Sequence, residues 1–491
     1  MVTSIVWLRR DLRLDDNVAL FDAARASEAV VCAFVLDPAL LRSRRTGAPI
    51  VQFFFESLRV LRERLRRHGS DLALLDGDPA RELTALAHRV DARALYLNAD
   101  DEPDAVARDA RVARVLRSAG IAVHVSTDHV YYGADEVLQT SGKPYVVYTP
   151  YRRRWDARFA AYPHPPVPSE RAALGKLLPA AAVASTREVP RPEDYGHASS
   201  DAYPRGGIDA ATRLLASFVE DGAAVYAARR NVPALDATSR LSPHLRAGTI
   251  GIRTVVHATR EYESFLGELV WRDFYQQLLR HQPRVATEPF LASARHIRYR
   301  DDGAAFDAWC AGRTGYPIVD AAMIQLNTTG WMHNRLRMIA ASFLTKHLLV
   351  DYREGERYFA QRLADADLAA NNGGWQWAAS TGTDAAPYVR VFNPSSQGKT
   401  FDATGAFVRS MIPALRGVPP AYVHEPWTMP PLLQAELGCV IGRDYPAPVV
   451  DHTFARGRAL EAYRVLSLPG AERSEASTRH GFTRSVKPVK T

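Results

Sequence analysis

The sequence predicts an α/β domain and an all-α domain that are joined by a long linker. In residues 1–135, short apolar runs alternate with amphipathic helical stretches, as in a Rossmann-like parallel sheet with helices on both faces. In residues 136–207 this pattern weakens, and eight prolines punctuate the part after residue 162. Residues 208–470 show almost wholly helical patterns. The basic, polar segment 471–491 is expected to be disordered.

Five apolar runs in the first domain are the expected strands. They are Ile5–Leu8, Val30–Leu36, Leu72–Leu75, Ala94–Leu97 and Ala122–Val125. The clearest helix between them is Val51–Arg67, where apolar residues recur at helical spacing and Arg and Glu occupy the other face. The linker is expected to run over the surface of both domains. In the second domain, Gly330–Leu349 is a long amphipathic helical stretch.

Composition narrows the class of protein. The three cysteines, Cys32, Cys310 and Cys439, are far apart, which argues against a disulfide framework and against a metal site. The N-terminal segment does not resemble a signal peptide, and no apolar run could span a membrane, so a cytoplasmic protein is expected. The net charge of +8 and the pI of about 9.4 permit a polyanionic partner, although a generally basic surface is the alternative.

Two segments of the helical domain suggest ligand binding. Hydroxyl groups before Pro243 predict a helix with Ser242 as its N-cap, and its free N–H groups could bind an anion beside Arg240. An ordinary capped helix is the alternative. Farther on, Glu268, Trp271, Arg272 and Tyr275 share one helix face, which suits a pocket for a planar ligand. The alternative there is an exposed Glu–Arg pair beside a half-buried Trp.

Two later segments carry further polar groups. Residues 331–338 place Asn334, Arg335 and Arg337 on a helix beside Met338, although Met at helical spacing is more often a core residue. Residues 365–377 hold two acids, two asparagines, two glycines and two tryptophans. Glycines allow a ligand to approach the backbone, and buried acids and amides need partners. We therefore interpret this last segment as a ligand-binding loop.

These segments resemble the cryptochrome/photolyase family over nearly the whole chain. The resemblance is carried by VWLRRDLRLDDN (6–17), TSRLS (238–242), ELVWRDFY (268–275), TGYPIVDAAMIQLNTTGWMHNRLRM (314–338), YREGERYF (352–359) and DADLAANNGGWQWAASTGTD (365–384). It implies an α/β antenna domain and a helical FAD-binding domain without a GxGxxG motif. It further implies a class I DNA photolyase, a monomer that repairs cyclobutane pyrimidine dimers in UV-damaged DNA with blue light.

The resemblance implies a site for FAD, with FADH⁻ as the active form. It places Tyr226, Thr238, Ser239, Arg240, Leu241 and Ser242 at the phosphates, and Phe265, Arg272 and the pair Arg337–Asp365 around the cofactor. Asp367 is expected near the ribityl chain or the ring, and Asn371 beside flavin N5.

On the substrate side, the resemblance implies a pocket for a flipped dimer. Its expected lining is Glu268, Trp271, Met338 and Trp377, with Asn334 and Arg335 alongside. Two indoles can stack on the lesion, and Glu268 can hydrogen-bond a thymine. Relatives that repair (6-4) lesions carry histidines around the third segment, whereas MHNRLRM here favours the dimer-specific branch. The resemblance also implies that one electron passes from excited FADH⁻ to the dimer and returns after both ring bonds open.

The chain departs from the family pattern at two places. Of the family's three relay tryptophans only Trp375 is present, while Tyr352 and Tyr299 stand at the other two positions, so slower photoreduction or a route through Trp309 or Trp331 is expected. Ala105 replaces a Glu of folate-binding relatives. The antenna chromophore, with contacts expected at Arg10, Asp37 and Asp101, stays open between folate, deazaflavin and flavin.

DNA phosphates are expected at Arg335, Arg390 and Lys399, with an affinity that falls as salt rises. Three other functions remain as alternatives. They are a cryptochrome photoreceptor with the same fold and FAD, a DNA-binding flavoprotein without catalysis, and an unrelated flavin oxidoreductase.

Overall fold

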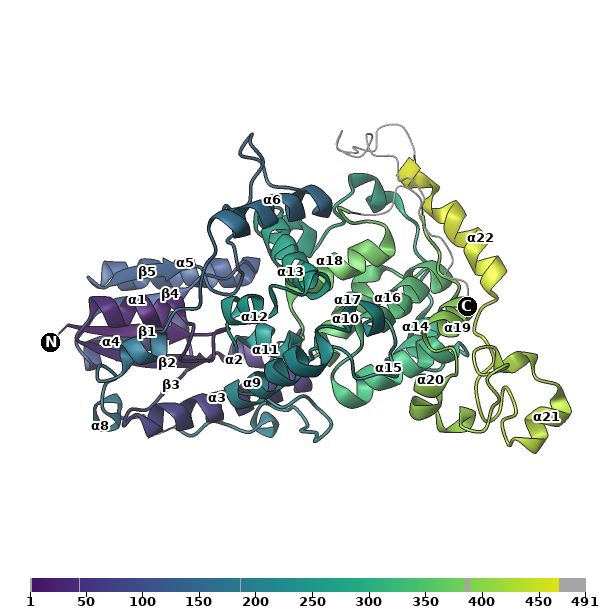
Figure 1. Ribbon diagram of the computed structural model, residues 1–491, viewed down its shortest axis with the longest axis horizontal. Helices are drawn as coiled ribbons and strands as arrows, with labels where there is room; N and C mark the ends of the chain where they lie inside the picture. Colours follow the sequence, from purple (N-terminus) through teal and green to yellow (C-terminus); the bar gives the residue numbers. More distant parts are fainter. Residues whose placement is uncertain (1, 44, 186, 385–388, 468–491) are drawn as a thin grey trace.

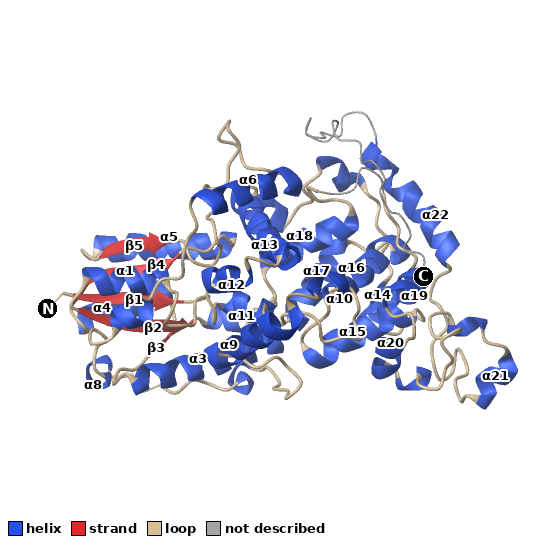
Figure 2. Ribbon diagram, viewed as in Figure 1, coloured by secondary structure: helices blue, strands red, loops and turns tan. Residues whose placement is uncertain are grey.

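The N-terminal domain is built on a parallel sheet with strand order β3-β2-β1-β4-β5 (Figures 1 and 2). The strands are β1 (Thr3–Leu8), β2 (Ala29–Leu36), β3 (Ala73–Asp76), β4 (Ala92–Asn98) and β5 (Ala122–Ser126). Each predicted strand is confirmed to within two residues at either end. The computed structural model describes residues 2–43, 45–185, 187–384 and 389–467, and the predicted tail 471–491 lies outside them.

Helices cover both faces of this sheet, as the continuous apolar runs of its strands require. They are α1 (Val18–Ala26), α2 (Pro38–Leu41), α3 (Ala48–Arg67), α4 (Pro79–Arg89) and α5 (Pro103–Ser118). Side chains of α1 and α3 pack with Val6 and Leu8 on one face, and those of α4 and α5 pack with Ile5 and Trp7 on the other. Helix α3 begins three residues before the predicted start, with Pro49 in its first turn, where the missing N–H costs nothing.

The linker has more regular structure than the sequence suggested. It contains α6 (Tyr148–Ala161), α7 (Ser169–Ala173), α8 (Ala180–Val183) and the 3₁₀ turn η1 (Pro192–Tyr195). Helix α6 packs against the helical domain, while Val30 of β2 exchanges backbone hydrogen bonds with the chain at Lys176 and Leu178. The linker therefore contacts both domains along its length (Figure 1).

The remaining chain forms the helical domain, drawn from teal to yellow in Figure 1. Its elements are α9 (Ile208–Ser217), η2 (Phe218–Gly222), α10 (Tyr226–Arg229), α11 (Ser242–Ala247), α12 (Ile252–Thr259), α13 (Glu263–His281), η3 (Pro283–Ala286), η4 (Ala292–His296), α14 (Gly303–Cys310), α15 (Pro317–Thr329), α16 (Asn334–Ser342), η5 (Phe343–Leu348), α17 (Tyr352–Arg362), α18 (Leu368–Ala379), α19 (Pro394–Phe401), α20 (Ala406–Met411), η6 (Pro413–Leu415), η7 (Pro426–Thr428), α21 (Pro431–Glu436), α22 (His452–Ala462) and η8 (Tyr463–Ser467). None of the helices in the described ranges is long and apolar enough to cross a membrane.

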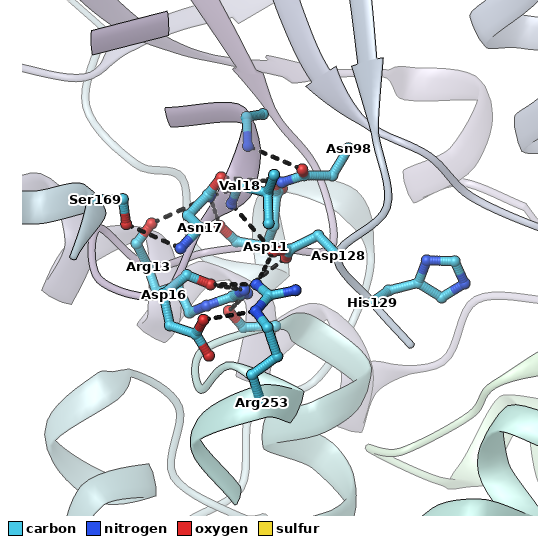
Figure 3. A network of polar contacts seen from close by, with 12 residues as sticks. Asp11, Arg13, Asp16, Asn17, Val18, Asn98, Asp128, His129, Ser169 and Arg253 are labelled. Atoms are coloured by element: carbon cyan, nitrogen blue, oxygen red, sulfur yellow. Dashed lines mark hydrogen bonds and ion pairs between the residues drawn. The ribbon is translucent and has the colours of Figure 1, made fainter. Parts of the chain in front are cut away.

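A buried ion-pair network joins the two domains (Figure 3). Arg13 and Asp16 lie between β1 and α1, Asp128 follows β5, and Arg253 reaches them from α12 of the helical domain. Asp128 accepts from both guanidinium groups, and Arg253 Nε lies 2.8 Å from an oxygen of Asp16. Burial opposes ionisation of Asp128, but the two arginines bring its pKa down to about 2.

Replacing Arg253 by Met should lower the free energy of unfolding by about 3–5 kcal/mol, because two buried carboxylates lose a partner. Chemical denaturation followed by circular dichroism measures this. Arg93→Met is the control, since Arg93 and Asp91 form an exposed pair worth less than about 1 kcal/mol. Equal stability of the two variants would contradict the assigned role of the network.

The unfolded pKa of Asp is about 3.9. The stabilisation by Asp128 should therefore be complete above about pH 4 and disappear as the pH falls towards 2.

Candidate functional site

Three helices carry all six residues expected to line the substrate pocket and several of those expected at the cofactor. Glu268, Trp271 and Arg272 lie on α13, Asn334, Arg335, Arg337 and Met338 lie on α16, and Asn371, Trp375 and Trp377 lie on α18. Helix α18 packs against both α13 and α16. The fold therefore brings together three segments that are far apart in the sequence.

The glycine-rich segment is a helix, and its interpretation as a loop is wrong. The Asp367 side chain caps α18 by accepting from Ala370 N at 3.0 Å. Within the helix, a Cβ on Gly373 would lie 2.2 Å from the ring of Tyr275, whereas one on Gly374 would meet nothing within 4 Å. Gly373 therefore serves the close packing of α18 on α13.

Asp367 is the most heavily contacted carboxylate of the site. It accepts from Arg10 of the N-terminal domain and, at 3.0 Å to each oxygen, from Gln276 Nε2 of α13. Burial disfavours the ionised form, but the charges of Arg10, Arg246 and Arg272 hold the pKa of Asp367 well below its usual range. The carboxylate is therefore ionised at neutral pH.

Next to it, Arg337 donates to Asp365 at 2.8 Å and, through Nε, to the carbonyl of Met332 at 2.8 Å. In the described part of the chain, the buried atoms Asp365 Oδ1, Gln276 Oε1 and Arg246 Nη1 have no hydrogen-bond partner. Buried polar atoms are rarely left unpaired, so these three atoms fit a polar ligand that donates and accepts hydrogen bonds. The hydroxyls and ring edge of a flavin nucleotide meet that requirement.

Arg272 and Asn371 are both oriented by backbone carbonyls. Arg272 donates to the carbonyl of His129, and its other terminal nitrogen lies 3.4 Å from the carbonyl of Leu245. Asn371 Nδ2 donates to the carbonyl of Glu356 at 2.9 Å. Burial raises the pKa of the Glu356 carboxyl to about 7, although Asn372 donates to both of its oxygens. The residue whose carbonyl holds Asn371 thus also carries a titratable group, which contacts the neighbouring Asn372.

On the α13 face, Glu268 pairs with Arg230 at 2.6 Å. Trp271 stacks on Tyr148 of α6, with ring centroids 3.6 Å apart and an interplanar angle of 5°. Its ring also stacks on Tyr275 at 5.5 Å. Arg230 and Tyr148 were missed from the sequence, because neither belongs to the periodic pattern of α13.

Besides Arg337, the third segment carries two polar residues, Asn334 and Arg335, in the first turn of α16. Asn334 is exposed, and Arg335 donates to Asn231 at 2.8 Å and lies over the ring of Phe401 at 4.3 Å. Met338 and Trp377 are half-buried against the main core of the helical domain. Asn231 is a further neighbour that no pattern in the sequence indicated.

The hydroxyl-rich segment differs from the expected N-cap. Helix α11 begins at Ser242, so the cap position falls on the buried Leu241, and no side chain makes a capping hydrogen bond. The prediction of Ser242 as N-cap is therefore wrong by one residue. The cap position falls on Leu241 because its side chain is buried, whereas Ser242 is exposed. Thr238 and Ser239 are half-buried, and Ser239 Oγ accepts from Leu241 N at 3.4 Å.

Two more residues of the expected phosphate region have clear contacts. Arg240 pairs with Asp236 at 3.0 Å and lies over the ring of Trp331 at 3.8 Å. The Tyr226 ring packs edge-on against Phe265 at 5.3 Å, and both side chains are buried. Tyr226 and Phe265, the latter in the first turn of α13, thus belong to one aromatic cluster.

The predicted relay residues are all in the helical domain, but their surroundings differ. Trp375 is buried, and its ring centroid lies 5.0 Å from Phe359 and 6.0 Å from Trp309. Burial raises the pKa of the Tyr352 hydroxyl, which has no hydrogen-bond partner among the described residues. Tyr299 packs at a separate small cluster that contains Tyr463.

The residues expected at an antenna lie at the carboxyl edge of the sheet. Arg10 Nη1 contacts Asp100 at 3.1 Å and Glu102 at 2.9 Å. Asp101 contacts His129 at 3.1 Å, and Asp37 caps α2 by accepting from Ala39 N at 2.9 Å. Arg390 and Lys399, which are expected at DNA phosphates, are both exposed. The Arg390 guanidinium lies over the ring of Phe392, and Lys399 pairs with Glu425 at 2.6 Å.

Comparison with known proteins identifies the family. Residues 4–170 match the family model described as DNA photolyase, and residues 265–465 match that of the FAD binding domain of DNA photolyase. The deoxyribodipyrimidine photo-lyase of Halobacterium salinarum is 42% identical over 483 residues, which cover 94% of this chain and 98% of that protein. The chain therefore belongs to the DNA photolyase family, and its helical domain is the family's FAD-binding domain.

Solved structures agree with this family and include two of its branches. A class III photolyase from Agrobacterium tumefaciens is 35% identical, with a TM-score of 0.86 over 95% of this chain and 98% of that one. The cryptochrome of Synechocystis sp. PCC6803 is 25% identical, with a TM-score of 0.84 over 94% and 99% of the two chains. The expected architecture, with an α/β domain and a helical FAD domain, is confirmed.

Gly373→Ala should destabilise the protein by about 1–3 kcal/mol, because the added methyl group collides with the ring of Tyr275. Gly374→Ala is the matched control one residue away, where open space lets Ala raise helix stability by up to about 1 kcal/mol. Thermal unfolding of the two variants distinguishes them. Similar melting temperatures would show that α18 does not pack on α13 as described.

Glu356→Gln should change how stability depends on pH. The folded pKa of Glu356 is about 7 and the unfolded value about 4.3, so the folded state binds more protons between these pH values. The contribution of Glu356 is complete below about pH 4.3 and falls by roughly 3 kcal/mol as the pH rises to 7. Gln carries no such dependence, so the variant should gain stability over the wild type from pH 5 to pH 8.

Urea denaturation at several pH values measures this gain. Glu354→Gln is the control, since Glu354 is exposed on the same helix and pairs with Arg357 at the surface. A difference between Glu356→Gln and the wild type that is constant from pH 5 to 8 would refute the assignment.

Proposed function

We propose that the protein is a deoxyribodipyrimidine photo-lyase of class I, which uses light to split cyclobutane pyrimidine dimers in UV-damaged DNA. The observation that carries the proposal is the junction of α13 and α18. Glu268 and Trp271 lie on α13, and Tyr275 of the same helix packs on Gly373 of α18. Trp377 follows Gly373 by one helical turn. An acid and two indoles at one junction suit a flipped, weakly stacked lesion better than a small soluble substrate.

Each lining residue has a separate role in holding the dimer. Glu268, oriented by its 2.6 Å contact with Arg230, accepts a hydrogen bond from the N–H of a pyrimidine. Trp271 is held by Tyr148, so its indole forms a rigid wall. Trp377 and Met338 supply the apolar remainder, with Asn334 and Arg335 at the rim. Closing this pocket around the lesion excludes water from the reacting bonds.

FAD fits the unpaired polar atoms of the site, and when bound in reduced form it supplies and takes back the electron that opens the dimer. We assign Asp365, Asp367, Arg337, Arg272 and Asn371 to the flavin and ribityl side. The phosphate and adenine side is assigned to Tyr226, Thr238, Ser239, Arg240, Leu241, Ser242 and Phe265. For photoreduction, we assign a relay through Trp375 with Tyr352 and Tyr299 as the distal members.

Around this centre we propose three further features. Arg335, Arg390 and Lys399 contact DNA phosphates, in keeping with the exposure of Arg390 and Lys399 and the half-buried position of Arg335. A second chromophore, a folate, deazaflavin or flavin, lies near Arg10, Asp37 and Asp101. The protein acts as a cytoplasmic monomer, and its three free cysteines suit a reducing compartment.

The decisive experiment is light-dependent repair. The reduced protein, mixed with an oligonucleotide that carries one thymine cyclobutane dimer, should restore intact thymines under near-UV or blue light but not in the dark. Trp271→Ala should weaken binding of the damaged oligonucleotide by about 1–3 kcal/mol, because a stacking wall is lost. Tyr162→Ala, at an aromatic ring that is 68% exposed, should bind as the wild type does.

Absence of repair with FAD bound and reduced would overturn the proposal. A blue-light photoreceptor of the cryptochrome type would then become the leading function. Unchanged lesion binding by Trp271→Ala would remove Trp271 from the pocket and leave the repair activity to other residues.

A further inference from the structure

The N-terminal domain holds the beginning of α18. Ala366 O accepts from Arg246 Nε at 2.6 Å, Asp367 accepts from Arg10, and Leu368 N lies 3.5 Å from Glu102 Oε1. Arg10 and Glu102 belong to loops at the carboxyl edge of the sheet, whereas Ala366, Asp367 and Leu368 lead into the helix of the site. Three consecutive residues are thus held by charged side chains, two of which come from the other domain.

These side chains form one buried charge cluster, the α18 clasp, which consists of Arg10, Asp100, Glu102, Arg246 and Asp367. Arg10 is its centre, because Nη1 contacts Asp100 and Glu102 while Nη2 contacts Asp367. The side chains of Arg10 and Asp367 are 10% and 8% exposed. Burial opposes ionisation of Asp100, yet the Arg10 charge holds its pKa well below the usual range. Removing Arg10 would leave buried carboxylates without compensation.

The clasp is linked directly to residues expected at the flavin. Asn371 N donates to Asp367 O at 2.8 Å, and Gln276 of α13 donates to the Asp367 carboxylate from the other side. Because successive turns of a helix are joined by hydrogen bonds, a shift of the first turn of α18 would move Asn371 and, one turn further, Trp375. The geometry of the site therefore depends on a side chain that belongs to the α/β domain.

We propose that Arg10 is a positioning residue of the flavin site, which acts from the N-terminal domain by fixing Asp367 and the start of α18. This role rests on the proposed placement of Asp367 and Asn371 beside the flavin. It makes the α/β domain a structural part of the cofactor site, whatever chromophore the same domain binds. The helical domain alone would lack the guanidinium that anchors its own cofactor helix.

The test compares Arg10→Gln, Arg10→Lys and Asp367→Asn in the full-length protein, with Arg9→Gln as the matched control. Arg9 is the preceding residue and pairs with Asp109 inside its own domain. Two quantities are measured. The first is the dissociation constant of FAD, from the flavin fluorescence that appears on release, and the second is the visible circular dichroism of bound flavin. Arg10→Gln should weaken FAD binding on the order of tenfold and alter the visible spectrum. Arg9→Gln should change neither.

Arg10→Lys should recover part of the affinity, because an ammonium group can pair with Asp367 but lacks the fork that also reaches Asp100. If Arg10→Gln fails to fold, this variant carries the comparison. The double variant Arg10→Gln/Asp367→Asn should lose less affinity than the sum of the single losses, since both remove one interaction.

The outcomes separate this inference from the function on which it rests. Impaired FAD binding in Asp367→Asn, with wild-type affinity and spectrum in both Arg10 variants, would overturn the role of Arg10 alone. Wild-type behaviour of Asp367→Asn would overturn the placement of Asp367 at the flavin, and the inference with it. Neither result depends on whether the protein repairs DNA.

Discussion

The arrangement of the two domains depends on a few buried charges that cross between them. Arg253 of the helical domain is enclosed by Asp16 and Asp128 of the α/β domain, and Arg13 completes the set (Figure 3). The backbone before α12 can approach Asp16 closely because Gly251 has no side chain. A Cβ on Gly251 would lie 1.8 Å from Asp16 Oδ2. Charges buried in this way must be paired, so they fix the relative position of the domains as apolar contacts alone would not.

This constraint places the carboxyl edge of the sheet against the cofactor domain. The loops that follow β1, β4 and β5 begin at this edge. Each loop supplies charged or carbonyl groups to helices that carry the site. Ligands of α/β domains gather at this edge because the loops converge there. Here the edge also supports the first turn of α18, so the α/β domain and the start of this helix form a single polar unit.

Much of this could be predicted from local patterns. Continuous apolar runs such as Val30–Leu36 marked the buried strands, because a parallel sheet is covered on both faces. Helical spacing placed Glu268, Trp271 and Arg272 on one face of α13. The local sequence pattern led to wrong predictions where tertiary contacts determine the local structure. The glycines of α18 suggested a loop, but packing on Tyr275 keeps that segment helical, and burial of Leu241 moved the start of α11.

The sequence by itself determined the two domain classes, the strands and the residue types available for a flavin and a damaged base, since periodicity and motif are local properties. Only the tertiary structure decided which distant groups meet. Arg10 lies 357 positions before Asp367, and Tyr148 comes from the linker to stack on Trp271. Such pairs leave no local signature, because their energy arises only when desolvated charges and ring faces find each other in the folded chain.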